Sequence, residues 1–426
     1  MATAALASTT GRRMVGASSN MGVTVWRIAW RNLWRNRRRT WLTAAGIAFA
    51  LWMLTFAVSL NEGTFGMMID NAARLSVGHI QLQHPGYQDD PRLEYTLTDA
   101  QALAAEVQTH PQVRFAVPRA TSFALAAAGE RSFGAQVVGV DYEQAPKWST
   151  LPSMQPEGRY IQGAGEAFVG ALLARNLGLE VGGEIVLLGT AKEGGIAAHV
   201  ARVVGTFSSG QAPLDRSMVQ IPLADFREGW GLAPTEAHAV VVIADTVAAS
   251  ERIAPTLAGP DWVSLDWMAL MPDAEQMKDM KIFGAQLFFL VITVIVTFSI
   301  VNTFMMTIFE RTPEFGTLMA IGMRPLSIVG QLMVESLWLW ALGVTIGLGF
   351  SGALLWLLGV TGVPLPIDPA DIISAYNIPD RLYPEFSWGS AAMGAAIMFV
   401  GTQLAALIPA LRIRRMRPVE ARRAAE

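Results

Sequence analysis

The sequence predicts a membrane protein in which four transmembrane helices carry a large extracytoplasmic α+β domain, inserted between the first helix and the second. Hydrophobic residues make up 52% of the 426-residue chain, which is more than an ordinary soluble protein contains. They concentrate in four runs, each long enough to cross about 30 Å of hydrocarbon: 40–60, 282–309, 332–360 and 388–411. The stretch between the first two runs has the mixed composition of a globular domain.

The charges indicate how the chain crosses the membrane. Residues 63–280 hold 25 acidic against 14 basic side chains, whereas arginines crowd both ends of the chain. By the positive-inside rule, both termini and the segment after the second span are cytoplasmic, and 63–280 lies outside. The chain contains no cysteine, which excludes disulfides, cysteine-bound zinc and a thiol nucleophile.

Residues 1–24 are small and polar, so we expect a disordered cytoplasmic segment. Residues 25–39 predict an amphipathic elbow helix in the inner membrane interface, with indoles at headgroup depth and arginines on lipid phosphates. Its two stripes are Trp26, Trp30 and Trp34, and Arg27, Arg31 and Arg35. A nucleic-acid patch is the alternative interpretation, but these arginines adjoin a span, and we expect no nucleic-acid partner.

The first span, 40–62, resembles a signal peptide, with a basic flank, an apolar core and Ala57-Val58-Ser59 as a potential cleavage site. Its apolar run is long for a signal and three spans follow, so we interpret it as an uncleaved anchor. The apolar residues keep a helical period from Asn61 to Leu75. This predicts that the helix continues outside the membrane as a stalk.

Alternating patterns predict strands in the domain over 63–280, at 79–83, 113–120, 132–140, 184–188, 201–206, 217–221, 239–244 and 262–265. Helical patterns predict helices at 99–109 with Thr98 as cap, at 166–177 ended by Gly178, at 223–229 and at 247–257. Interleaved strands and helices are typical of α/β and α+β domains.

His79 and His84 could hold a metal across a strand end and a turn. Two solvated loop histidines are the preferred interpretation, and we expect no metal.

The remaining spans are predicted at 281–309, 326–360 and 388–411. The second of the four spans holds about 42 Å of uncharged helix at 1.5 Å per residue, so we expect it to project outward as well. The third and fourth carry small residues four positions apart, which let helices approach closely in lipid. These are Gly343, Gly347 and Ser351 in the third span, and Ser390/Gly394 and Ala391/Ala395 in the fourth.

Two polar side chains interrupt the spans. We interpret Asn302 as the donor or acceptor of an interhelical hydrogen bond. Glu335 could snorkel to the inner interface or bind a ligand, and snorkelling is the preferred interpretation.

A loop at 361–387 and a basic cytoplasmic tail at 412–426 complete the chain. The sequence contains no P-loop, G-x-S-x-G or H-E-x-x-H motif, so we expect no catalytic residue.

A charged, glycine-punctuated segment, 310–325, joins the second span to the third. Carboxylates at its start and apolar residues at helical spacing predict a short amphipathic helix at the membrane face. Pro313 would lie in its first turn and Pro325 would end it. The residues that carry this interpretation are Glu310, Arg311, Glu314, Phe315, Gly316, Ala320 and Gly322.

In that register, the segment resembles the cytoplasmic loop of FtsX-like permeases, the MacB/LolC/LolE superfamily of ABC transporter subunits, whose phrase has the type E-R-x-x-E-x-G-x-x-x-A-x-G. Residues 28–33 with 39–43 resemble the elbow of this family, and 408–412 with 417–421 resemble its C-terminal end. Residues 170–182 are similar to a phrase of the MacB-type periplasmic core domain.

The resemblance implies a dimer with a second copy or a paralogue, clasping two separate cytoplasmic ATPases. The ATPases would bind ATP and magnesium, and this chain would hold no cofactor. The segment 310–325 would be the coupling helix seated on the ATPase, and ATP-driven closure would move the external domains, an action called mechanotransmission. The chain has no fused ATPase as MacB has, and its external domain is larger than that of FtsX.

We therefore expect a LolC/LolE-like permease of a bacterial inner membrane that acts on lipoproteins or another amphipathic cargo. Its other partners would be membrane lipids and a periplasmic cargo or carrier, such as a lipoprotein chaperone. Three alternatives stay open: an efflux permease of a tripartite MacB-like system, an FtsX-like regulator of cell-wall hydrolases, and a membrane-anchored enzyme whose activity would reside in 63–280.

Overall fold

The computed structural model describes residues 26–364, 381–384 and 386–415. The chain divides into two compact units. The helical unit comprises Met1–Gly63, Met280–Val363 and Tyr383–Glu426, and the sheet unit comprises Thr64–Asp279 and Pro364–Leu382. The predicted disordered N-terminus, most of the 361–387 loop and most of the basic tail lie outside the described residues.

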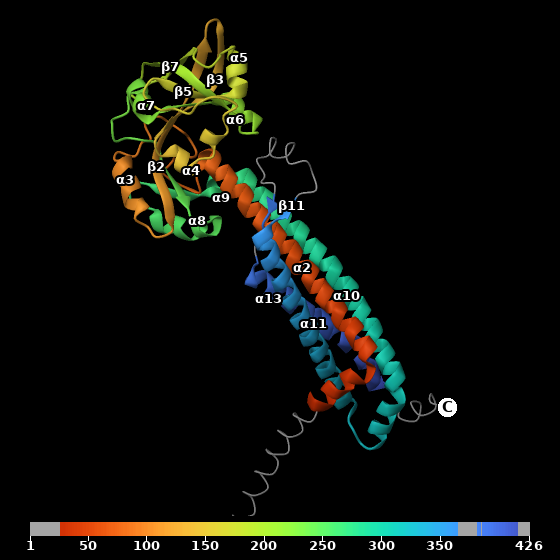
Figure 1. Cartoon of the computed structure of the whole chain (residues 1–426). Helices are drawn as coiled ribbons and strands as arrows, with labels where there is room; N and C mark the ends of the chain where they lie inside the picture. Colours follow the sequence, from red (N-terminus) through yellow and green to blue (C-terminus); the bar gives the residue numbers. More distant parts are fainter. Residues whose placement is uncertain (1–25, 365–380, 385, 416–426) are drawn as a thin grey trace, which may run out of the picture. The chain divides into compact units, whose positions relative to one another are not determined.

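Four long helices form the helical unit, and Figure 1 shows them running alongside one another. They are α2 (Arg37–Ala72), α10 (Pro272–Ala320), α11 (Pro325–Thr361) and α13 (Trp388–Ala410). In the described part of the chain these are the helices long and apolar enough to cross a membrane. A helical segment at 26–33, a 3₁₀ turn η1 (Trp34–Asn36) and a second one, η5 (Leu411–Arg415), adjoin them.

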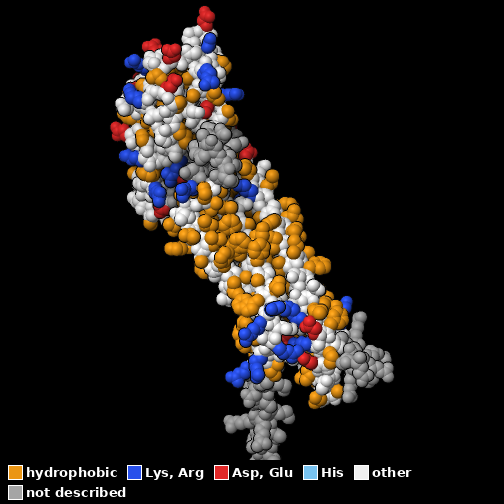
Figure 2. Space-filling model, turned by 45° about the vertical axis from the view of Figure 1, so that its right-hand side comes forward, with side chains coloured by type: hydrophobic (Ala, Val, Ile, Leu, Met, Phe, Trp, Pro, Cys, Tyr) orange, Lys and Arg blue, Asp and Glu red, His pale blue; other side chains and the backbone are white. Residues whose placement is uncertain are grey.

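The first helix continues beyond Leu60 to Ala72, as its sequence period predicts, and then passes through the π-helical turn η2 (Ala73–Val77). On the face drawn in Figure 2, apolar side chains cover the middle of the helical unit, and basic side chains gather toward one end. Exposed apolar side chains on α10 include Leu287, Phe288, Leu290, Ile295 and Phe298. This distribution is what lipid contact requires, since hydrocarbon favours apolar side chains on the outside of the helices.

Small residues fix how closely α11 and α13 pack on α2. A Cβ atom on Gly343 would lie 2.7 Å from the side chain of Ile47, and one on Gly347 would lie 2.9 Å from the carbonyl oxygen of Ala48. On α13, a Cβ on Gly394 would lie 2.6 Å from Leu54. Ser351 is buried and its hydroxyl donates to the carbonyl of Gly347. The predicted small-residue stripes therefore face a neighbouring helix, as expected where lipid supplies no hydrophobic drive between helices.

Asn302 differs from its sequence interpretation. It is exposed on α10 and forms no interhelical hydrogen bond with the described residues. The next residue, Thr303, faces α2 instead, with its hydroxyl 3.5 Å from that of Thr43. Helix phase explains the difference, because successive residues of an α-helix point about 100° apart.

Glycine at position 347 should be required for this packing. We expect Gly347→Ala to lower the midpoint of thermal unfolding of the full chain in mild detergent, because the added methyl group meets the backbone of α2, which must shift. Gly349→Ala is the matched control on the same helix, since its Cβ would meet no atom within 4 Å and alanine favours helix by roughly 1 kcal/mol. Equal midpoints for the two variants would show that the α2–α11 contact is looser than described.

The described residues of the sheet unit form a ten-stranded mixed sheet, in the order β10-β1-β9-β2-β3-β8-β5-β7-β4, with β6 paired to β2 and β7. The strands are β1 (Ile80–Gln83), β2 (Val113–Ala128), β3 (Arg131–Val140), β4 (Glu157–Gly158), β5 (Glu166–Gly170), β6 (Glu184–Thr190), β7 (Ile196–Phe207), β8 (Met218–Pro222), β9 (Ala239–Ala244) and β10 (Val263–Asp266). Two further short strands, β11 (Val363–Pro364) and β12 (Arg381–Leu382), fall near the ends of the predicted 361–387 loop.

Short helices cover the sheet (Figure 1). They are α3 (Ala100–Gln108), α4 (Ala145–Trp148), α5 (Ala171–Leu177), α6 (Ala212–Ser217), α7 (Leu223–Trp230), α8 (Val247–Ile253) and α9 (Trp267–Leu270), with 3₁₀ turns η3 (Leu151–Ser153) and η4 (Ala254–Leu257). One buried cluster lies under α5 and α7 and contains Phe226 and Trp230. Another lies under α3 and α8 and contains Leu103 and Ile253. The long strand β2 contributes residues to both clusters.

Strand β2 connects the two halves because it changes partners along its length. Residues 113–119 pair with β9, and residues 120–128 pair with β3. Its last part also pairs with β6. A strand of this length is long for a globular protein, where most strands have about five or six residues. It therefore acts as the continuous element between two smaller sheets.

Most predicted strands lie within a residue or two of observed strands at one end, but three local interpretations are wrong. Residues 166–170 form strand β5 rather than the start of a helix, since this segment is inserted between β7 and β8 in the sheet. Helix α3 is capped by Asp99, whose carboxylate accepts the N–H of Ala102, and not by Thr98. His79 is buried rather than solvated: its Nδ1 accepts the N–H of Ala244.

Candidate coupling site

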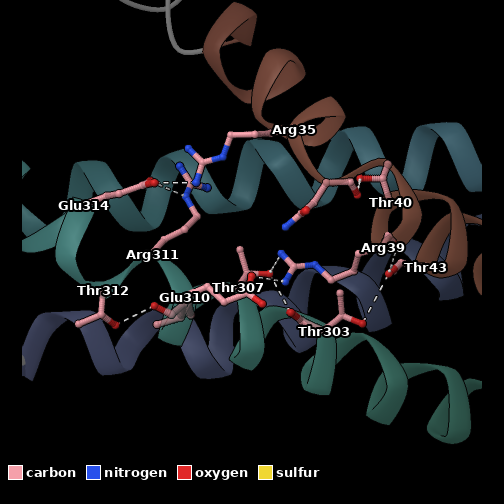
Figure 3. Close-up of polar contacts among 12 residues, drawn as sticks. Arg35, Arg39, Thr40, Thr43, Thr303, Thr307, Glu310, Arg311, Thr312 and Glu314 are labelled. Atoms are coloured by element: carbon pink, nitrogen blue, oxygen red, sulfur yellow. Dashed lines mark hydrogen bonds and ion pairs between the residues drawn. The ribbon is translucent and has the colours of Figure 1, made fainter. Parts of the chain in front are cut away.

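A cluster of charged side chains ties the elbow, α10 and α11 together in the helical unit (Figure 3). The elbow and the start of α2 supply Asn32, Arg35 and Arg39; α10 supplies Thr307, Glu310, Arg311 and Glu314; and α11 supplies Glu335. Three of these residues, Glu310, Arg311 and Glu314, belong to the coupling segment predicted from the sequence, whereas Arg35 was predicted as an elbow arginine at the membrane interface. Asn32, Arg39, Thr307 and Glu335 were not among the predicted site residues.

Glu335 is the buried centre of this cluster, with 6% of the residue exposed. Its carboxylate accepts from the amide nitrogen of Asn32 at 2.7 Å and from Nη1 of Arg311 at 3.1 and 3.2 Å. A charge in such a position needs a partner, because an uncompensated buried charge is strongly destabilising. The preferred sequence interpretation, a snorkelling side chain, is therefore wrong. Glu335 instead holds α11 to α10 and to the elbow.

Glu314 and Glu310 make the outer contacts of the cluster. Glu314 accepts from Nη2 of Arg35 at 2.6 Å and from Nε of Arg311 at 3.1 Å. Glu310 accepts from Nη1 of Arg39 at 3.0 Å, and the same guanidinium donates to the hydroxyl of Thr307. Both carboxylates are more than 40% exposed, so each pair by itself contributes between about 0 and 1 kcal/mol. Their joint effect is to fix the orientation of the elbow against the end of α10.

The elbow packs on α11 through aromatic rings. Trp338 of α11 lies 5.5 Å from Trp26 and 4.8 Å from Trp30 between ring centroids, and Trp34 lies 5.6 Å from Trp30. Trp26 and Trp30 keep about two fifths of their surface exposed, which leaves them able to reach lipid headgroups. Arg27 and Arg31 are exposed, and Arg35 pairs with Glu314. The predicted contact of these arginines with lipid phosphates stays a prediction.

Residues 310–325 do not form a helix of their own. Helix α10 runs unbroken through Pro313 to Ala320, and Pro325 begins α11 instead of ending a helix. The end of α10 is a Schellman motif: Gly322 donates to the carbonyl of Met319, and Met323 donates to that of Leu318. Gly322 has φ +102°, where a side chain would be strained. This explains why glycine occupies that position.

Phe315 and Gly316 are buried within the chain and are not available to a partner. Phe315 is 1% exposed and packs with Ile328, Leu332 and Ile413, while the guanidinium of Arg311 lies 5.2 Å from its ring centroid. The predicted apolar stripe therefore closes the end of the helical unit. The exposed surface lies further along, over 320–327, which we call the tip. Its apolar members are Ala320, Ile321, Met323 and Leu326.

A cavity of about 60 Å³ lies among the charged side chains. This volume is close to that of one or two water molecules, at about 30 Å³ each in the liquid. It is far below the roughly 300–1,000 Å³ of small-molecule sites. The described residues contain no group of three metal-ligating side chains. The hydrogen bonds of Glu335 and Glu314 join the elbow, α10 and α11, so the cluster is a structural joint, and the tip beside it is exposed.

Two family matches together cover most of the chain. Residues 40–257 match the family of MacB-like periplasmic core domains, and residues 286–418 match the FtsX-like permease C-terminal family. The chain belongs to the FtsX-like permeases with a MacB-like periplasmic core domain. This FtsX-like permease is thus a multi-pass membrane protein, the transmembrane subunit of an ABC-type transporter, and its sheet unit is the extracytoplasmic domain.

Individual proteins are similar to this chain over different parts of it. The permease is 23% identical over 411 residues to the lipoprotein-releasing system transmembrane protein LolC of Neisseria meningitidis, which covers 90% of this chain and 94% of that protein. It is 33% identical over 78 residues to the macrolide export ATP-binding/permease protein MacB of Neisseria gonorrhoeae, or 18% of this chain and 12% of that one. The periplasmic region of MacB from Actinobacillus actinomycetemcomitans aligns at a TM-score of 0.35 and 13% identity, over 49% of this chain and 97% of that one.

Removing the buried carboxylate should destabilise the permease more than removing an exposed one. We expect Glu335→Ala to cost about 3–5 kcal/mol, because it leaves the guanidinium of Arg311 without its buried partner. Glu310→Ala should cost less than about 1 kcal/mol. The midpoint of thermal unfolding, followed by tryptophan fluorescence of the full chain in mild detergent, compares them. Similar losses for both variants would contradict the central role of Glu335.

Proposed function

We propose that this permease transmits ATP-driven motion from separate cytoplasmic ATPase subunits to its periplasmic core domain, and that it acts in the release of lipoproteins from a bacterial inner membrane. The observation that carries the lipoprotein assignment is the match to LolC, which extends over nearly the whole of both chains. The match to MacB covers only a small part of that protein, so efflux is the weaker assignment. Control of cell-wall hydrolases is a further alternative.

Helix α10 supports the transmission step. It is continuous from Pro272 to Ala320, about 74 Å at 1.5 Å per residue, and joins the end of the extracytoplasmic domain to the tip. Since that domain lies outside and α10 crosses the membrane once, the tip faces the cytoplasm. A force on the tip would reach α11 through the pair of Arg311 with Glu335, and the elbow through the pair of Glu314 with Arg35. It would also displace α10 along its length.

The separate ATPase subunits would bind ATP and magnesium. The sequence contains no P-loop, so two ATPase subunits would supply nucleotide binding and hydrolysis, one beneath each permease of a dimer. The second permease would be another copy of this chain or a paralogue. Exposed Ile321, Met323 and Leu326 offer the ATPase an apolar contact, and burial of apolar surface is the main favourable contribution to most protein–protein association.

A charge on the tip should disrupt ATPase binding. We expect Ile321→Asp to reduce the amount of ATPase that co-purifies with the full chain in mild detergent at least tenfold, because Ile321 is 80% exposed at the tip. Met277→Asp is the control, since Met277 is exposed near the opposite end of α10. Retention of the ATPase by the Ile321 variant would refute the tip as the docking surface.

A charge exchange tests whether Glu314 acts mainly through its pair with Arg35. We expect Glu314→Arg to uncouple ATP hydrolysis from transport, since Arg35 would then face a like charge. The double variant Arg35→Glu/Glu314→Arg should recover at least half of the coupled activity if the two residues serve mainly each other. Failure of the double variant, with the ATPase still bound, would mean that the pair with Arg35 is not the main role of Glu314, since the new arginine also faces Arg311, whose Nε lies 3.1 Å from the native carboxylate.

A further inference from the structure

The periplasmic core domain contains a cavity of about 570 Å³, within the size range of small-molecule sites. It is lined by strands β1, β2, β3, β8 and β9, with the chain after β1 on one side. Among the described lining residues, Arg119 is the side chain that carries a full charge at neutral pH, and none is Asp or Glu. The cavity therefore favours a ligand with negative charge.

The cavity lies where β2 changes partners. Arg119 is paired with Ala239 of β9, and the next residue, Ala120, is paired with Gly139 of β3. Just beyond this point the N–H of Thr121 donates to Nδ1 of His238, at 3.0 Å, in place of a strand carbonyl. Burial lowers the pKa of His238 to about 4, so the ring stays neutral and keeps its Nδ1 as an acceptor. At the position where β2 changes partners, the His238 side chain therefore supplies the acceptor for the backbone.

Two polar side chains near this point of β2 each have a buried atom without a hydrogen-bond partner among the described residues. The buried Nε of Arg119 has no hydrogen bond, and its guanidinium forms no ion pair with any described residue. Burial lowers the pKa of Arg119 to about 10, which leaves it charged at neutral pH. Gln83 is 2% exposed, and its Oε1 has no partner although its amide nitrogen donates to Gln81. Polar groups buried in this way cost free energy unless a bound molecule satisfies them.

Gln83 and Arg119 face the same cavity because the sheet places them in one row. Both are paired with Ala239 of β9, one from each side. Residues directly opposite each other in neighbouring strands point to the same face of a sheet. An anionic group bound there would reach both side chains.

Along β2 the same face changes from charged to apolar. Alternation places Arg119, Thr121, Phe123 and Leu125 on one side of the strand. Phe123 is 69% exposed and Leu125 44% exposed. Leu188 of β6 is paired with Leu125 and is also exposed. A charged end and an apolar surface about 13 Å away, at roughly 3.3 Å per residue from Arg119 to Phe123, match a molecule with a charged head and an alkyl chain.

We propose that this domain binds an anionic amphiphile, with its carboxylate or phosphate group on Arg119 and Gln83 and its alkyl chain along Phe123, Leu125 and Leu188. A fatty acid and an alkyl phosphate share this chemistry. The site shares no residue with the charged cluster at Glu335. A failure of this binding proposal would therefore not contradict the proposal that the permease transmits ATP-driven motion.

Equilibrium dialysis of the full chain in nanodiscs of neutral lipid tests the site, with empty nanodiscs subtracted. Radiolabelled decanoate and decyl phosphate are the amphiphilic anions, acetate is the head alone and decanol is the uncharged chain. We expect saturable binding of one decanoate or decyl phosphate per permease, and at least tenfold weaker binding of acetate and decanol. The tighter of the two anions identifies the head group.

Three variants locate the binding. Arg119→Gln should weaken decanoate binding at least tenfold, whereas Arg114→Gln, an exposed arginine on the same strand, should leave it unchanged. Phe123→Asp changes only the exposed apolar face, about 13 Å from Arg119 at 3.3 Å per residue, and should also weaken decanoate binding at least tenfold. This variant provides a test even if Arg119→Gln fails to fold. Decanoate binding that is absent, that is unchanged in Phe123→Asp or that is matched by decanol would overturn the proposal.

Discussion

The buried carboxylate of Glu335 is the interaction on which the helical unit depends. It is the point where the elbow, α10 and α11 meet, through Asn32 and Arg311. A carboxylate at this depth is tolerated only with partners in place, so the three elements must keep their relative positions. The tip that follows α10 is therefore attached to a joint of defined geometry rather than to a free loop.

This joint explains why the residues before the tip are internal. Phe315 fills the apolar space beneath Arg311, and the Schellman motif at Gly322 then turns the chain toward α11. The segment 310–322, which resembles the cytoplasmic loop of the family, thus has two roles at the end of α10. Its charged residues and Phe315 hold the chain together, and the exposed residues from Ala320 onward are available to another protein. A change at Glu314 would remove the contact of α10 with Arg35 of the elbow.

The extracytoplasmic domain rests on a different constraint, the length of β2. One strand serves two sheets, so the place where its partners change cannot be filled by regular pairing. His238 replaces the missing acceptor and Arg119 remains without a counter-ion among the described residues. The cavity follows from strand topology, and its charge follows from one residue. Neither feature is visible in the spacing of motifs along the chain.

The sequence by itself determined the number and order of the spans, the inserted α+β domain and the family, because hydrophobic length, charge asymmetry and helical period are local properties that neighbouring residues express without reference to the fold. It also located the segment in which part of the charged cluster and the tip lie. Only the tertiary structure decided the partners of Glu335, the burial of Phe315 and His79, the strand at 166–170 and the cavity at Arg119. These depend on contacts between residues tens to hundreds of positions apart, such as Asn32 and Glu335. A local sequence pattern does not predict which distant side chain will pair with a buried charge.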